Sequence, residues 1–201
     1  MGGTIILNGS PRAPISNSKR YAQIFSKSFK CTSEYFNISK TNHLELCSKI
    51  DGFSDMLFVF PLYADGIPAV LLNFIKTLEE NPPERKPVIS VLINCGFLEY
   101  HQNDVAVDMI KLFCRQNGYR FGSVLKIGSG ESILDTPFKI LVVRKIKKLA
   151  DSIVNAHYCT LQTTMPLSPK MFIKASASYW INYGKRNGIN REQMETMQIE
   201  K

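Results

Sequence analysis

The chain has 201 residues, of which 44% are hydrophobic and 21% charged, and its formal net charge at pH 7 is +8. This composition is typical of a globular protein with one domain, or one domain and an appendage, that is long enough to bury a sizeable core. No apolar stretch approaches the ~18 residues that a membrane span requires, and no basic segment precedes an apolar one at the N-terminus, so we expect neither a membrane contact nor a signal peptide.

Short β-rich segments alternate with helical patterns along most of the chain. The predicted strands lie at 4–7, 33–38, 56–60, 88–93 and 123–127, and the predicted helices at 21–29, 41–52, 69–78, 105–116 and 139–154. Such alternation predicts a parallel sheet with helices on both faces.

The strands differ in how apolar they are, and this difference predicts their order. Segments 4–7, 56–60 and 88–93 are nearly all apolar, as expected of strands that are buried on both faces. Segments 33–38 and 123–127 are interrupted by polar residues and fit the edges. The order 2-1-3-4-5 satisfies this pattern. We therefore predict a flavodoxin-like, doubly wound α/β fold with a five-stranded parallel sheet.

The loop after the first strand reads N-G-S-P-R-A-P-I-S-N-S and leads into a helix. A helix N-terminus presents free N–H groups and a partial positive charge, and hydroxyls and a guanidinium add donors, which together suit a phosphate. The alternative is an ordinary connection whose polar residues only cap the helix. Neither G-x-x-x-x-G-K-S/T nor G-x-G-x-x-G occurs, because Gly128-Ser129-Gly130 lacks the third glycine. The candidate phosphate residues are Ser10, Arg12, Ser16, Asn17 and Ser18.

The loops after the third and fourth strands offer features that suit a flat aromatic ring. The first reads P-L-Y-A-D-G-I-P and combines a restricted backbone with an aromatic side chain; the second reads N-C-G-F-L-E-Y-H-Q and combines a glycine with amide side chains. Each loop alone could equally be a rigid connection or a turn. Carboxyl ends of parallel strands meet at one edge, so the three loops together predict an FMN site. The candidate ring residues are Pro61, Leu62, Tyr63, Ala64, Asp65, Asn94, Cys95, Gly96, Phe97 and Gln102.

Much of the positive charge lies on segment 139–154, whose apolar residues keep helical spacing. Such a charge run is typical of the solvated face of an amphipathic helix. A nucleic-acid interface is the alternative, but no recognised motif or aromatic platform accompanies the charge, so we expect no nucleic-acid partner. A basic surface would also attract an anionic cofactor.

The last part of the chain does not continue the alternation. Pro166 and Pro169 mark a break, a helix with the single tryptophan is predicted at 170–183, and a short helix is predicted from Asn190. We therefore expect an FMN-binding domain at 1–157 and a helical extension at 158–201 that packs on this domain or on a second subunit.

The five cysteines are odd in number, widely scattered and without a C-x-x-C pair, which fits reduced thiols and a cytoplasmic location. The three histidines have no metal-ligand spacing, so we expect no metal. A nucleophilic Cys95 is disfavoured because no histidine or lysine neighbours it in sequence.

Three segments, N-G-S-P-R with S-N-S, P-L-Y-A-D-G-I-P, and N-C-G-F-L-E with Gln102, resemble the flavodoxin-like NAD(P)H-dependent FMN reductase family. The resemblance spans about residues 4–130. It implies FMN phosphate at Ser10, Arg12, Asn17 and Ser18, with the flavin ring against 61–65 and 94–97. It also implies a homodimer. Two features depart from relatives: the basic chain lacks the Thr-rich phosphate loop of acidic flavodoxins, and it lacks the compact cysteine cluster of iron–sulfur relatives.

From these residues and this resemblance we expect an FMN-dependent oxidoreductase that takes hydride from NADH or NADPH and passes electrons to a small acceptor, such as a quinone, a nitro- or azo-aromatic compound, or free flavin. The cofactor carries that chemistry, so no catalytic side chain is assigned. The alternatives are a flavodoxin-type electron carrier without its own NAD(P)H chemistry and a non-enzymatic binding or regulatory module on the same fold.

Overall fold

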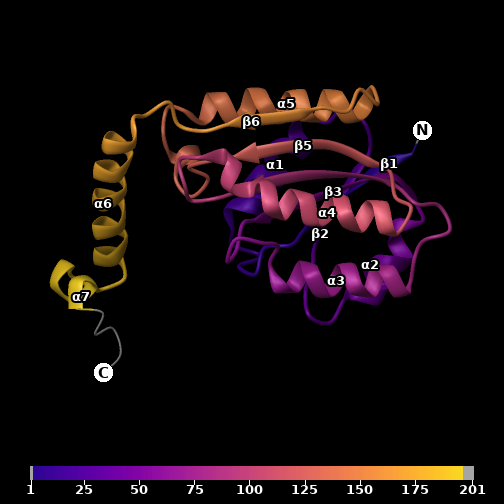
Figure 1. Cartoon of the computed structure of the whole chain (residues 1–201), viewed down its shortest axis with the longest axis horizontal. Coiled ribbons are helices and arrows are strands. Elements are labelled where there is room, and N and C mark those ends of the chain that lie inside the picture. Colours follow the sequence, from indigo (N-terminus) through magenta and orange to yellow (C-terminus); the bar gives the residue numbers. More distant parts are fainter. Residues whose placement is uncertain (1, 197–201) are drawn as a thin grey trace. The chain divides into compact units, whose positions relative to one another are not determined.

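The computed structural model describes residues 2–196 (Figure 1). The chain divides into two compact units with the boundary between Met165 and Pro166. The first unit contains the sheet, and the second contains the two C-terminal helices.

The first unit is built on a six-stranded sheet in the order β2-β1-β3-β4-β5-β6. Every pair of neighbouring strands is parallel. This arrangement confirms the predicted α/β flavodoxin-like fold and the order of the first five strands. The strands are β1 (Gly3–Asn8), β2 (Ser33–Asn37), β3 (Phe53–Pro61), β4 (Val88–Asn94), β5 (Phe121–Ile127) and β6 (Thr160–Thr163).

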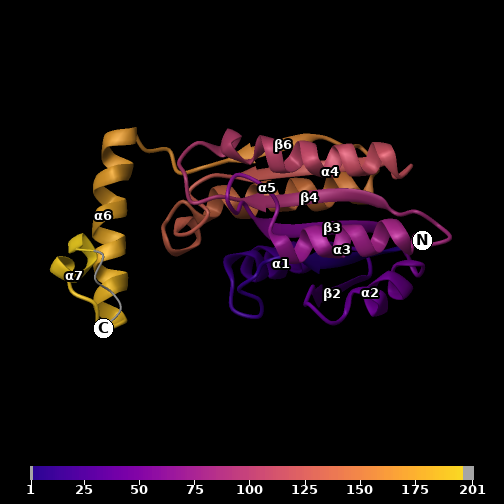
Figure 2. The same cartoon turned by 60° about the horizontal axis from the view of Figure 1, so that its bottom comes forward.

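Five α-helices cover the two faces of the sheet, and α3 and α4 lie in front of the strands in Figure 2 while α1 and α5 lie behind them. The helices are α1 (Asn17–Ser28), α2 (His43–Ile50), α3 (Ala69–Glu80), α4 (Asp104–Gln116) and α5 (Lys139–Val154), with short 3₁₀ helices η1 (Tyr100–Asn103) and η2 (Ile133–Asp135). The helices predicted from periodicity are therefore present, including the short one at 41–52.

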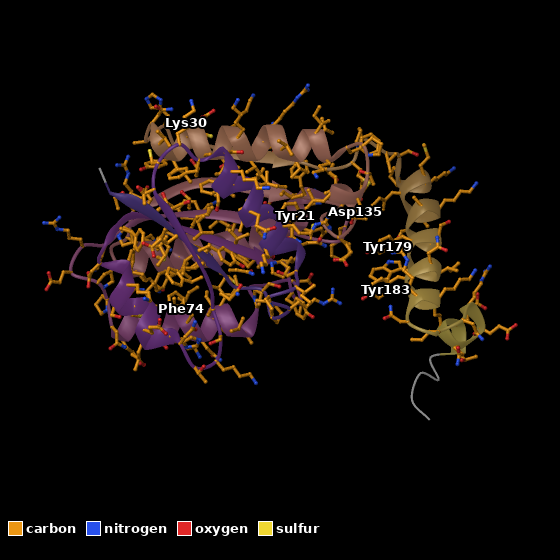
Figure 3. All side chains as sticks on the ribbon, turned by 180° about the vertical axis from the view of Figure 1, so that it is seen from behind. Tyr21, Lys30, Phe74, Asp135, Tyr179 and Tyr183 are labelled. Carbon is orange, nitrogen blue, oxygen red and sulfur yellow. The ribbon has the colours of Figure 1, made fainter. Side chains whose placement is uncertain are left out.

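The core follows from the apolar central strands. In β3, Met56 to Phe60 are fully buried, and alternate residues of β1, β3 and β4 join one cluster with α2, α3 and α4. Phe74 of α3 is fully buried in this cluster (Figure 3). Because the side chains of a strand alternate between faces, the remaining strand residues pack beneath α1 and α5.

The prediction of five strands was wrong by one. Strand β6 pairs with β5 in register from Val124 with Thr160 to Ile127 with Thr163. The sheet therefore continues past residue 157, the predicted end of the first domain. The sequence T-L-Q-T is short and mostly polar because β6 is an edge strand, and it lacks the apolar run by which the central strands were recognised.

The second unit consists of α6 (Pro169–Arg186) and α7 (Arg191–Thr196), which agrees with the two helices expected there. Ser168 caps α6 by accepting a hydrogen bond from the backbone N–H of Met171, and Pro169 follows at the first turn. Tyr179, Trp180 and Tyr183 form mutual ring contacts, with Tyr179 and Tyr183 on the same side of α6 (Figure 3). Packing of this unit on the domain or on a second subunit stays a prediction.

Between residues 2 and 196, no helix combines the length and the apolar character that crossing a bilayer demands.

Candidate functional site

The loops after β1, β3 and β4 meet at the carboxyl edge of the sheet, as their strand order predicts. Asn94, at the end of β4, joins them: its side-chain oxygen Oδ1 accepts a hydrogen bond from Ser18 Oγ at 3.3 Å, and its carbonyl oxygen accepts one from the Leu62 N–H at 2.7 Å. Ser18 is at the start of α1, and Leu62 follows β3. The polar residues that lie far apart in the sequence therefore form one contiguous region.

The loop after β1 is ordered by its own side chains. Ser10 is buried, its N–H donates to Asn8 Oδ1 at 3.0 Å, and its Oγ accepts from the Arg12 N–H at 3.3 Å. Ser16 is the N-cap of α1 and accepts from the Lys19 N–H at 3.1 Å. Ser10 thus orders the loop and Ser16 caps α1, while the phosphate contacts predicted for both serines stay a prediction.

The start of α1 carries basic side chains. Its first turn contains no acidic residue but includes Lys19 and Arg20, where the helix dipole already favours anions. The first N–H groups of a helix have no intrahelical partner, so the backbone adds donors there. A cavity of about 350 Å³ opens at this point. Its lining residues are Arg12, Pro14, Ile15, Ser16, Asn17, Lys19, Arg20, Gln23 and Glu131.

The loop after β3 contains a tight turn in an uncommon conformation. Ala64 and Asp65 have φ angles of +45° and +56°, and Tyr63 and Gly66 on either side exchange two backbone hydrogen bonds of 3.0 Å. Two consecutive positive φ angles are typical of a type I′ turn, and non-glycine residues adopt them at some cost. This turn holds Tyr63 with 53% of its surface exposed.

In the loop after β4, the first residues are buried and the following ones are exposed to solvent. Asn94 and Cys95 are buried, whereas Gly96, Phe97 and Gln102 are exposed. A Cβ atom added at Gly96 would meet nothing within 4 Å. Such open space above a backbone lets a flat ligand approach closely.

Each of the three loops exposes one large apolar side chain. Ile15, Tyr63 and Phe97 are 88%, 53% and 51% exposed, respectively. Exposed apolar side chains around convergent polar groups are typical of a ligand site. We call the loops after β3 and β4, residues 62–68 and 95–99, the apolar end of the candidate site.

The N–H, carbonyl and Sγ groups of the buried Cys95 all form hydrogen bonds within the protein. Its N–H donates to the Ile127 carbonyl at 2.9 Å, its carbonyl accepts from the Gly130 N–H at 2.7 Å, and its Sγ accepts from Asn103 Nδ2 at 3.4 Å. Burial raises the pKa of the Cys95 thiol, which disfavours the thiolate that a nucleophile requires. The predicted contact of Cys95 with a flavin ring stays a prediction.

A fourth loop, whose residues were not predicted as part of the site, completes it. It follows β5 and covers residues 128–135. The Ser129 N–H donates to the Phe97 carbonyl at 2.5 Å, and the Tyr21 hydroxyl, buried in α1, donates to the Gly130 carbonyl at 2.7 Å. A Cβ atom at Gly130 would lie 2.7 Å from Asn94 Cβ. The G-S-G-E sequence directly after a strand was the signal that could have revealed this close approach.

This fourth loop brings two carboxylates to the start of α1. Asn17 Nδ2 donates to the Glu131 carbonyl at 2.9 Å and to Glu131 Oε2 at 3.3 Å, while Arg12 Nη1 lies 3.8 Å from Glu131 Oε1. Arg20 Nη1 donates to Asp135 Oδ2 at 3.0 Å, and this hydrogen bond lowers the pKa of Asp135. In Figure 3, Tyr21 and Asp135 lie at the same end of the sheet. We call residues 9–20 and 128–135 together the anion end of the candidate site.

Among residues 2–196, no three His, Cys, Asp or Glu side chains are grouped in a way that could hold a metal ion.

No family model matches the sequence, and no curated protein shows significant similarity to it. Solved structures do match. An FMN-dependent NADH-azoreductase from Bacillus anthracis, solved with FMN, is 14% identical with a TM-score of 0.60, over 76% of this chain and 99% of its own. A Streptococcus pneumoniae flavodoxin is 14% identical with a TM-score of 0.56, over 77% of this chain and 99% of its own.

A third structural match is the rubredoxin oxygen:oxidoreductase of Desulfovibrio gigas, at 13% identity and a TM-score of 0.61 over 78% of this chain. This chain spans only 36% of that protein. NAD(P)H:quinone oxidoreductases also match at low identity. At such identities the matches show the fold alone, and this is the flavodoxin-like fold.

Proposed function

We propose that this chain is an FMN-dependent oxidoreductase that takes hydride from NADH or NADPH and passes electrons to a small acceptor. One observation carries the proposal: the carboxyl edge of the sheet joins a helix start that carries basic side chains to the exposed aromatic side chains of Tyr63 and Phe97. A phosphate and a flat ring linked by a short chain fit such a pair of neighbouring surfaces.

The chemistry of the donors fits the cofactor. At the anion end, Arg12 and the backbone N–H groups at the start of α1 suit a phosphate, and Ser18 and Asn17 lie beside them. At the apolar end, Tyr63 and Phe97 offer exposed aromatic surface, and the backbone at Gly96 is open to a ligand. These residues would bind FMN.

FMN, when bound, supplies the hydride and electron transfer. The protein binds and orients it: the phosphate contacts fix one end, while Tyr63 and Phe97 limit the approach of water to the other. Several matching structures are named as azoreductases or quinone oxidoreductases, which supports a small aromatic acceptor. A homodimer remains part of the proposal through the resemblance of the sequence segments.

A flavodoxin-type electron carrier is the second candidate, because a flavodoxin is among the structural matches. The net charge of +8 argues against a carrier of the acidic flavodoxin type. Reduction by a pyridine nucleotide distinguishes the two candidates.

The test is an absorbance spectrum of the purified protein after FMN is added and free FMN removed by desalting, followed by anaerobic addition of NADH or NADPH. A retained flavin band that bleaches rapidly supports the oxidoreductase. A band that persists favours the electron carrier, and a colourless protein contradicts both.

A further inference from the structure

We propose that the Glu131 carboxylate competes with the phosphate of the ligand for the anion end, and so determines how strongly the protein prefers a phosphorylated flavin over an unphosphorylated one. This inference rests on the proposed function, which it deepens, and Glu131 is not among the site residues predicted from the sequence. No segment of the resemblance includes Glu131.

Glu131 already uses the donors that a phosphate would need. Its Oε2 accepts a hydrogen bond from Asn17 Nδ2 at 3.3 Å, and its Oε1 lies 3.8 Å from Arg12 Nη1. Asn17 is the first residue of α1, where the helix dipole attracts negative charge. Glu131 also lines the cavity at this helix start. The protein's own carboxylate thus stands where an incoming anion is most favoured.

The backbone beneath Glu131 holds the carboxylate at this place. The Gly130 N–H and carbonyl are both paired, with the Cys95 carbonyl at 2.7 Å and with the buried Tyr21 hydroxyl at 2.7 Å. The Glu131 carbonyl itself accepts from Asn17 Nδ2 at 2.9 Å. The side chain is only 32% exposed. Movement of the carboxylate away from the cavity is therefore limited to rotation of its own side chain.

The consequence is a selective charge effect. A phosphate monoester carries about −1.5 to −2 charges at pH 7, so it is repelled by Glu131 and must also displace it from Arg12 and Asn17. Riboflavin ends in a neutral hydroxyl group and experiences little of this repulsion. Neutralising Glu131 should therefore increase FMN affinity while leaving riboflavin affinity nearly unchanged.

The test compares wild type, Glu131→Gln and a matched control, Glu80→Gln, in titrations with FMN and with riboflavin followed by flavin fluorescence. Glu131→Gln keeps the shape of the side chain and one oxygen acceptor for Asn17. Glu80 is exposed at the end of α3, outside both ends of the candidate site, and it does not line the cavity. We expect the ratio of FMN to riboflavin affinity to rise on the order of tenfold in Glu131→Gln and to stay within about twofold in Glu80→Gln. Arg12→Ala should lower the same ratio. An unchanged ratio in Glu131→Gln overturns the inference.

A second readout does not depend on flavin. Inorganic phosphate should raise the melting temperature of Glu131→Gln more than that of wild type, relative to sodium chloride at equal ionic strength. If none of the proteins binds a flavin, the proposed function and the flavin preference fail together, and this measurement then tests only whether Glu131 opposes anion binding at the anion end. A larger phosphate shift in Glu131→Gln supports Glu131 as the competing anion, and equal shifts contradict it.

Discussion

The two ends of the candidate site are built in opposite ways. At the anion end, side chains and backbone are already paired: Arg12 with Glu131, Arg20 with Asp135, and Tyr21 with the Gly130 carbonyl. At the apolar end, Tyr63 and Phe97 are half-exposed and the space above Gly96 is empty.

One site can therefore divide ligand recognition between its two ends. Paired polar groups are held in fixed positions, so the anion end discriminates by charge and by the exchange of existing partners. Exposed apolar surface has no partner to lose, so the apolar end contributes through the area that a ligand covers. If so, substitutions at the anion end should destabilise the protein more than substitutions at the apolar end.

The largest expected effect comes from a pair of glycines, one at each end. A Cβ atom at Gly128 would lie 2.5 Å from the Leu98 carbonyl oxygen, whereas one at Gly96 would meet nothing within 4 Å. Gly128→Ala should lower the free energy of unfolding by about 2–3 kcal/mol, because backbone must shift, while Gly96→Ala should change it by less than about 0.5 kcal/mol. Urea unfolding of the two variants measures both changes in the free energy of unfolding. Equal decreases would contradict the proposed difference in packing between the two ends.

A smaller effect is expected from a pair of buried tyrosines. The Tyr21 hydroxyl donates to the Gly130 carbonyl, whereas the Tyr119 hydroxyl, which is buried in the core, has no hydrogen-bond partner in the described part of the chain. Tyr21→Phe should lower the free energy of unfolding by about 1–2 kcal/mol, because it leaves a buried carbonyl without this donor. Tyr119→Phe should leave the free energy of unfolding unchanged or raise it. Thermal unfolding at pH 7 compares them. A Tyr21→Phe variant as stable as wild type would show that this hydrogen bond does not hold the loop after β5.

The smallest expected effect concerns the exposed pair of Arg20 and Asp135. The hydrogen bond from Arg20 lowers the pKa of Asp135, so its stabilisation is present above the unfolded-state pKa of about 3.9 and is lost as the pH falls through the lower folded-state value. Because both side chains are substantially exposed, Asp135→Asn should cost no more than about 1 kcal/mol at pH 7. The difference between the free energies of unfolding of wild type and Asp135→Asn, measured with urea, should shrink between pH 4 and pH 3. A difference that does not change with pH would show that the charge of Asp135 is not its cause.

The fold was predictable because its signals are local and repeated. The apolar runs of β3 and β4 and the polar interruptions of β2 and β5 indicated which strands are central, and the parallel order followed. Strand β6 was missed because an edge strand buries little and needs no apolar run. Its pairing with β5 depends on tertiary structure that T-L-Q-T does not encode.

The candidate site was predictable in its location and less so in its contacts. Strand order alone brings Ser18, Leu62 and Asn94 together. The hydrogen-bond partner of the Asn17 side chain was not predicted, because this partner is Glu131, which lies 114 positions further along the chain. Long-range pairing of one amide with one carboxylate leaves no periodic pattern, and only the close-packed glycines around Ser129 could have indicated it.

The most direct test of the account is a set of ¹H–¹⁵N NMR spectra of the full chain during titration with FMN. Binding across both ends predicts that the amide signals of the non-proline residues in 10–18, 62–66 and 95–98 shift together and saturate at one concentration, while amides at the opposite edge of the sheet, such as those near Ser33 and Val88, stay in place. Shifts confined to the opposite edge, or no saturable shift in any of the three loops, would contradict the assignment of this edge as a flavin site.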